Sequence, residues 1–141
     1  MTSHLQQLEA LLSSWPDISI HPHRFGGHEF RFGHAELGHL HPDGTLDIPF
    51  PRTFRDALLD ERLAQEHHWI PNSGWTTFRL RGERDLPHAL WLLRLSYLRY
   101  ALKTAPDSAK LFEQENATLQ LSPRFKSLME KLVPRHVTPN S

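Results

Sequence analysis

The sequence predicts an α+β fold: a single domain whose antiparallel sheet packs against a central helix at about residues 84–103, with a helical C-terminal extension. Apolar and polar residues alternate in several short segments before residue 81, which is typical of strands with one buried face. The segment 84–103 carries two apolar stripes at helical spacing, so most of its circumference should be buried. Because hairpin turns join the strand segments and helices do not alternate with parallel strands, the pattern favours α+β over α/β.

The elements follow from local signals along the chain. Ser3 and Gln6 form a capping-box pattern, so we expect a helix over about 3–15, which Pro16 ends. Strands are expected at 18–20 and 28–32, followed by a hairpin of 35–41 and 45–50. Pro51 opens a helix of about 51–64, and two further strands are expected at 66–70 and 75–81. A polar helix at about 107–117 and a short amphipathic helix from Ser122-Pro123 through Leu132 then form the extension. We therefore assign residues 1–105 to the domain and 106–141 to an extension packed on it.

Composition limits the classes of function. The 141 residues suffice for one domain, and 16 basic against 16 acidic side chains give no overall field that would attract nucleic acid or an anionic membrane. The absence of cysteine excludes disulfides, cysteine zinc sites and thiol nucleophiles, and it fits a reducing compartment. There is no apolar run of about 18 residues and no pattern of a signal peptide, so we expect a cytoplasmic protein without a membrane partner.

The most informative motif runs from His39 through His41 to Asp47. Pro-Asp-Gly at 42–44 suits a three-residue hairpin loop, because Pro fixes φ at the first position and Gly accepts positive φ at the third. This loop pairs His41 with Thr45 and places His39 opposite Asp47. Strand side chains alternate, so both imidazoles and the carboxylate should lie on one face of the sheet.

Three interpretations of this cluster are open. It can be the polar face of a half-solvated sheet. It can bind zinc or iron, with Asp47 as the third ligand beside His39 and His41. It can also transfer protons or orient a substrate without metal, because the unperturbed pKa of histidine lies near neutral pH. No His-Glu-x-x-His helix or cysteine ligand supports a metal, so we expect no metal and no cofactor.

Further candidate residues lie outside the motif. Trp75 is either an aromatic wall of a pocket or a core residue. Arg24 and Arg79 can clamp a carboxylate or an enolate of a ligand, although single arginines on strands are often only solvated charges. Tyr97 on the central helix packs in the core or extends its hydroxyl to the site. We assign Arg24, Trp75, Arg79 and Tyr97 to substrate binding.

The order of several motifs resembles a bacterial luciferase-like domain family, named for its similarity to fungal luciferase. The resemblance covers about residues 15–103. It is carried by Pro22-His23-Arg24-Phe25-Gly26-Gly27, Glu36-x-x-His39-x-His41, Asp43-Gly44, Ser73-Gly74-Trp75 and Leu90-Trp-Leu-Leu-Arg-Leu-Ser96-Tyr97.

The resemblance implies oxidation of a hydroxylated pyrone by O2 with loss of CO2, without a known metal or organic cofactor. It adds Glu36 to the substrate-binding residues. Neighbouring residues of a strand point to opposite faces, so only one of His67 and His68 can join the cluster of His39, His41 and Asp47. The resemblance to the basic-His-Pro loop of the fungal enzyme favours His68. The chain departs from the fungal enzyme in two ways: it lacks an N-terminal membrane-anchoring segment, and Asp47 stands where that enzyme has another histidine.

A weaker resemblance, in fold, is to the YjbR/MmcQ double-wing domains, some of which are regarded as DNA-binding. It is carried by His68-Trp69, Trp75-x-x-Phe78, Asp85-x-Pro87 and Ser96-Tyr97. The alternative function is therefore a non-catalytic interaction or nucleic-acid-binding module, against which the neutral charge counts. Our expectation is a cofactor-independent oxygenase or binder of a planar hydroxylated aromatic or pyrone, with O2 as co-substrate and His39, His41, Asp47 and His68 as catalytic residues.

Overall fold

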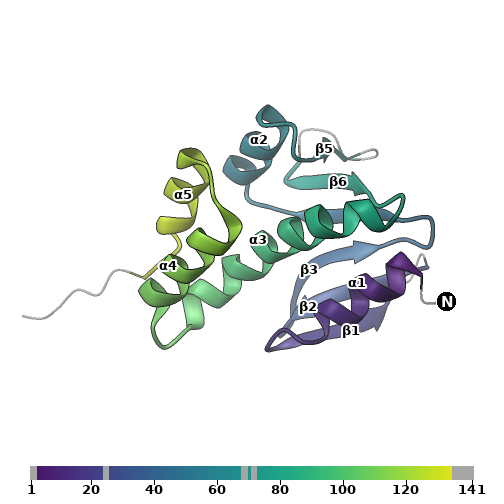
Figure 1. The fold of residues 1–141 in the computed structure, drawn as a ribbon, viewed down its shortest axis with the longest axis horizontal. Coiled ribbons are helices and arrows are strands. Elements are labelled where there is room, and N and C mark those ends of the chain that lie inside the picture. Colours follow the sequence, from purple (N-terminus) through teal and green to yellow (C-terminus); the bar gives the residue numbers. More distant parts are fainter. Residues whose placement is uncertain (1–2, 24–25, 68–69, 71–72, 135–141) are drawn as a thin grey trace, which may run out of the picture. The chain divides into compact units, whose positions relative to one another are not determined.

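The computed structural model describes the chain except residues 1–2, 24–25, 68–69, 71–72 and 135–141. Within this described part, six strands form one antiparallel sheet in the order β1-β2-β3-β4-β6-β5 (Figure 1). The strands are β1 (Ile18–Pro22), β2 (His28–Phe32), β3 (Ala35–Leu40), β4 (Thr45–Pro49), β5 (Gln65–Glu66) and β6 (Trp75–Arg79). The α+β class and the antiparallel sheet predicted from the sequence are confirmed.

The helices are α1 (His4–Leu12), α2 (Arg52–Asp60), α3 (Leu86–Thr104), α4 (Ser108–Leu119) and α5 (Pro123–Glu130), with a 3-10 turn at Glu83–Asp85 before α3. The capping box of α1 forms as predicted: Ser3 Oγ accepts from the Gln6 backbone N–H at 3.1 Å, and Gln6 Oε1 accepts from Ser3 N at 3.1 Å. The helices of the described residues do not combine the length and apolar character needed to cross a bilayer.

The chain divides into two compact units, residues 1–97 and 98–141, with the boundary inside α3. In the second unit, the Asp107 carboxylate caps α4 by accepting from the backbone N–H of Lys110 at 3.1 Å. The Ser122 hydroxyl likewise caps α5, whose Phe125 and Met129 are buried. The packing of residues 106–141 as an extension of a 1–105 domain stays a prediction.

Several predicted elements differ in length from those in the structure. The helix predicted over 51–64 ends at Asp60, because Arg62 adopts a left-handed conformation with φ +58°. The N–H of Arg62 then bonds the Leu59 carbonyl at 3.1 Å, and the N–H of Leu63 bonds the Leu58 carbonyl at 2.8 Å. This is the Schellman arrangement that ends helices. The strand predicted over 66–70 overlaps the two-residue β5 at Glu66, and residues 68–69 of that prediction lie outside the described residues. Strand β6 ends at Arg79, two residues before the predicted position 81.

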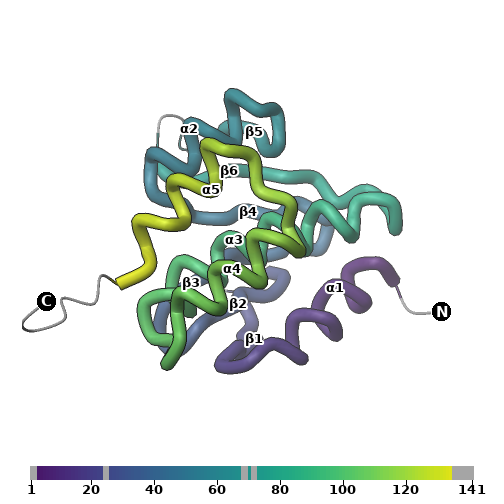
Figure 2. The backbone as a smooth tube through the Cα atoms, turned by 60° about the vertical axis from the view of Figure 1, so that its left-hand side comes forward, coloured from purple at the N-terminus to yellow at the C-terminus, as the bar shows by residue number. Residues whose placement is uncertain are grey.

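One face of the sheet is covered by helices. Tyr97 of α3 contacts the rings of Phe32 and Trp15, at centroid distances of 5.5 and 5.4 Å. On β2, Glu9 of α1 bonds His28, so α1 lies on the same face as this part of α3. Figure 2 shows the path of the backbone from a second direction. On β4 and β6, Thr45, Asp47, Thr77 and Arg79 alternate with Leu46, Ile48 and Phe78, so these four polar residues lie on the opposite face.

A β-bulge in β3 interrupts the alternation. Phe30 pairs with Gly38 and Arg31 pairs with Glu36, so Leu37 is an extra residue without a partner across the ladder. The Leu37 side chain is buried, and its carbonyl accepts from the Ser96 hydroxyl at 2.8 Å. In a regular strand, residues three apart point to opposite faces. The bulge instead places Glu36 on the same face as His39, which decides the composition of the site.

Candidate functional site

The hairpin has the predicted loop and register. His39 pairs with Asp47 across β3 and β4, and the backbone N–H of His41 bonds the Thr45 carbonyl at 2.9 Å. Gly44 has φ +92°, as the third loop position requires. The Asp43 carboxylate accepts from the backbone N–H of Thr45 at 2.9 Å, which closes the loop. The prediction that both imidazoles and the carboxylate share one face is confirmed.

Asp47 lies at the centre of the cluster and is 1% exposed. Its Oδ2 is 2.8 Å from His41 Nε2, 3.3 Å from His39 Nε2 and 3.6 Å from His67 Nε2. Its Oδ1 accepts from the Thr77 hydroxyl at 2.7 Å. A buried carboxylate is costly unless it is paired and hydrogen-bonded, and imidazole N–H groups with one hydroxyl supply those partners here.

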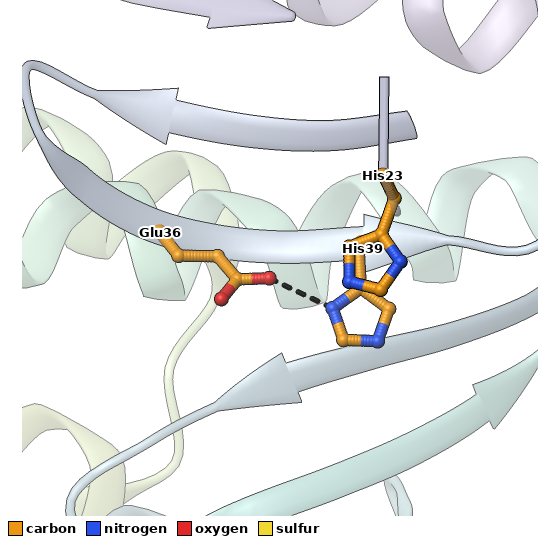
Figure 3. Close-up of side chains that lie close together, drawn as sticks. All are labelled: His23, Glu36 and His39. Atoms are coloured by element: carbon orange, nitrogen blue, oxygen red, sulfur yellow. Dashed lines mark hydrogen bonds and ion pairs between the residues drawn. The ribbon is translucent and has the colours of Figure 1, made fainter. Parts of the chain in front are cut away.

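The far nitrogen of His39 is also occupied. Nδ1 donates to Glu36 Oε1 at 2.7 Å, so the ring lies between two carboxylates. Figure 3 shows Glu36 reaching this nitrogen, and the ring of His23 lying over the ring of His39. The two rings stack at 4.3 Å between centroids with an interplanar angle of 22°. The position of His39 is therefore fixed from both edges and from one face.

These contacts shift the pKa values in opposite directions. Burial alone lowers the pKa of His39, but hydrogen bonds to Asp47 and Glu36 outweigh burial and raise it from 6.5 to about 9. Burial raises the pKa of Asp47, yet hydrogen bonds from His39, Thr77 and His41 hold it well below its ordinary 3.8. The pKa of His23 is lowered, first by burial and then by the like charge of His39. In the metal-free protein His39 is thus an imidazolium at neutral pH.

We expect the cluster to make folding stability depend on pH. The raised pKa of His39 contributes stability that is fully present below 6.5 and is lost as pH rises through about 9. The lowered pKa of Asp47 contributes stability that is present above 3.8 and is lost as pH falls further. With EDTA present, the difference in melting temperature between the wild type and His39→Gln should shrink between pH 6.5 and pH 10. A constant difference over this range would contradict the pairing.

The aromatic side chain of Trp75 lies beside the cluster, and Arg79 lies further along the same strand. The half-buried ring of Trp75 lies 5.3 Å from His39 and 6.0 Å from His67, measured between centroids. Trp75 therefore borders the polar cluster, as a pocket wall would. Arg79, on the same face of β6, donates to Thr45 Oγ1 at 3.2 Å and is exposed. It stands opposite Thr45, two residues along β6 from Thr77, which stands opposite Asp47.

The structure brings together His39, His41, Asp47, Glu36 and Trp75 from the predicted set. Tyr97 lies on the helix-covered face, buried against Trp15 and Phe32, so its ring does not join the cluster. Arg24 and His68 lie outside the described residues. The catalytic and substrate-binding roles of all these residues stay predictions.

Sequence reasoning missed His67, His23 and Thr77. The neighbour rule for strands indicated that one of the residues 67 and 68 faces the cluster, and it is His67 that the structure shows near Asp47. Its Nδ1 accepts from the backbone N–H of Ile70 at 3.2 Å, which directs Nε2 toward the carboxylate. Thr77 could have been found from the pairing of β4 with β6, where it stands opposite Asp47.

The arrangement has two chemical capacities. Imidazole groups beside a buried carboxylate can move a proton or hold an anion. Among the described residues, two overlapping groups also bring donor atoms within 4.8 Å of one another, as a shared metal ion needs. One is His39, His41 and Asp47, and the other is His23, Glu36 and His39.

Comparison with known proteins gives one family. Residues 34–96 match the family model described as Luciferase domain. The matched segment runs from β3 into α3, so it contains Glu36, His39, His41, Asp47 and Trp75 but not His23. No curated protein and no solved structure gives a significant match. Over residues 34–96, the chain is therefore similar to the Luciferase domain family.

Proposed function

We propose that the luciferase-like domain binds a planar, acidic hydroxylated aromatic or pyrone and oxidises it with O2. The observation that carries this proposal is the convergence of His39 and His41 on the buried Asp47, beside the ring of Trp75. The whole cluster lies in the segment that matches the Luciferase domain model.

The reaction requires the protein to remove the enol proton and to stabilise the resulting oxygen anion. His39 and His41 divide these tasks in the proposal, because the Nε2 atoms of both rings lie within 3.3 Å of Asp47 Oδ2. The enolate then reacts with O2, and loss of CO2 follows. Both atoms of O2 remain in the products, so one O2 is consumed per CO2 released and no external reductant is needed. Trp75 forms the apolar wall against the ring of the substrate and limits water.

Aerobic incubation with a panel of hydroxypyrones and hydroxylated aromatics tests the proposal, with O2 uptake, CO2 release and light as readouts. We expect turnover of at least one compound, and a loss of about 100-fold or more in His39→Ala and His41→Ala. His34→Ala is the matched control, because His34 is an exposed histidine in the turn between β2 and β3 and should leave turnover unchanged. Neither turnover nor binding of any compound would contradict the proposal, and equal activity in all three variants would contradict the site.

A further inference from the structure

The side chains of His39, His41 and Asp47 meet the requirements of a metal centre. Metal ligands bonded at about 2.0–2.2 Å lie about 3 Å apart when they are at right angles and about 3.4 Å apart in a tetrahedron. Asp47 Oδ2 is 2.8 Å from His41 Nε2 and 3.3 Å from His39 Nε2. Asp47 Oδ2 thus already has ligand-like separations from both Nε2 atoms, and the donor atoms of the three residues all lie within 4.8 Å of one another on one face of the sheet.

The remaining polar atoms of two of these residues are held by other groups. The Glu36 carboxylate accepts from His39 Nδ1 at 2.7 Å, which orients the ring and leaves Nε2 toward Asp47. The Thr77 hydroxyl donates to Asp47 Oδ1 at 2.7 Å, which leaves Oδ2 toward the histidines. Metal-bound histidines characteristically donate their other N–H to a carboxylate or carbonyl, and ligating carboxylates are themselves hydrogen-bonded.

We propose that His39, His41 and Asp47 bind one divalent transition-metal ion, Fe²⁺ in the active protein. Two imidazoles and one carboxylate on one side of an ion leave open positions opposite them, and this set is characteristic of non-haem Fe²⁺ sites that react with O2. The choice of an O2-reactive ion rests on the proposed function, whereas binding of a divalent ion rests on the ligand geometry alone. With the ion bound, His39 and His41 would hold it, and the ion would supply the stabilisation of the substrate oxygen anion that the histidines supply in the metal-free protein.

The neighbouring group of His23, Glu36 and His39 is a second position for a metal ion, and it shares His39 with the first. It would use the Nδ1 edge of His39, and its three residues are all more exposed than Asp47. The hydrogen bond between Glu36 and His39 gives Glu36 an orienting role in the buried group instead. Variants at His23 and His41 therefore distinguish the two positions.

The test uses the full-length chain and the metal alone. After EDTA treatment and dialysis, Fe²⁺ is added without oxygen, or Co²⁺ is added as a spectroscopic probe, and bound metal is measured by calorimetry and elemental analysis. We expect one equivalent per chain. His41→Ala should weaken binding by more than about 100-fold, and Glu36→Gln by about 10- to 100-fold. His34→Ala should leave the affinity unchanged, and His23→Ala, which removes only the ring stacked on His39, should weaken binding far less than His41→Ala.

The variants are compared only where far-UV circular dichroism shows a folded protein, and His41→Gln serves as a second variant that keeps a polar side chain. Binding of less than one equivalent, or equal affinity of wild type and both His41 variants, overturns the proposal. Loss of binding in His23→Ala but not in His41→Ala also overturns it. Turnover of a hydroxypyrone by the EDTA-treated protein would overturn the metal site and leave the proposed function standing. Binding of one equivalent of metal without turnover of any compound would overturn the proposed function and leave the metal site standing.

Discussion

Replacing Asp47 with alanine is expected to destabilise the protein by about 3–5 kcal/mol, because it removes the charge around which a buried polar cluster is built. The side chain is 1% exposed and pairs with His41 at 2.8 Å and Thr77 at 2.7 Å. Without it, the N–H groups that face Asp47 lose their acceptor in a site with little access to water. For a chain of this size the loss corresponds to a fall in melting temperature of about 10 °C or more.

Asp43→Ala is the matched control, since Asp43 is an exposed carboxylate in the loop of the same hairpin. Its carboxylate accepts from the backbone N–H of Thr45 at 2.9 Å, and loss of this exposed hydrogen bond should cost about 1 kcal/mol. Urea denaturation in the presence of EDTA measures both variants without a contribution from bound metal. A cost for Asp47→Ala as small as that for Asp43→Ala would show that the cluster does not depend on the buried charge.

The pairing of His39 with Asp47 could be predicted because the signals that determine it are local. Pro42, Asp43 and Gly44 fix the length of the loop, and strand alternation then fixes which side chains share a face. No knowledge of distant segments is needed for this step. The same reasoning fails wherever a second strand or a bulge decides the direction of a side chain.

Glu36 illustrates the bulge. Strict alternation places Glu36 and His39 on opposite faces, and only the extra residue Leu37 brings them together at 2.7 Å. The sequence contains a sign of this irregularity in Gly38, because glycine inside a strand often marks a bulge or a close approach. A Cβ atom at Gly38 would lie 3.0 Å from the Asp47 carbonyl oxygen, so the absence of a side chain lets β3 and β4 approach. Pattern reasoning can suggest such a bulge but not its position.

His67 illustrates dependence on distant segments. Alternation limits the choice to one of two neighbouring histidines, and the choice depends on where the chain leaves β5. Helix α2 ends at Asp60, Arg62 then adopts a left-handed conformation, and the chain pairs with β6 already at Gln65 and Glu66. The resemblance to a family favoured His68, which lies outside the described residues.

Gly44→Ala should destabilise the hairpin that carries the site by about 3 kcal/mol or more. Two costs add: an L-residue at φ +92° is strained, and the new Cβ would lie 2.2 Å from the Leu80 carbonyl oxygen. That oxygen belongs to the backbone, which cannot move aside without disturbing the 2.8 Å bond from Leu80 N to the Gly44 carbonyl.

Gly33→Ala is the matched control, because Gly33 has φ +59° but nothing within 4 Å of the added Cβ, so only the strain of about 1 kcal/mol remains. Urea denaturation of the two variants isolates the steric cost, and metal binding by Gly44→Ala then reports whether the histidines keep their positions. Equal destabilisation by the two substitutions would mean that the loop does not approach Leu80 as closely as the structure indicates.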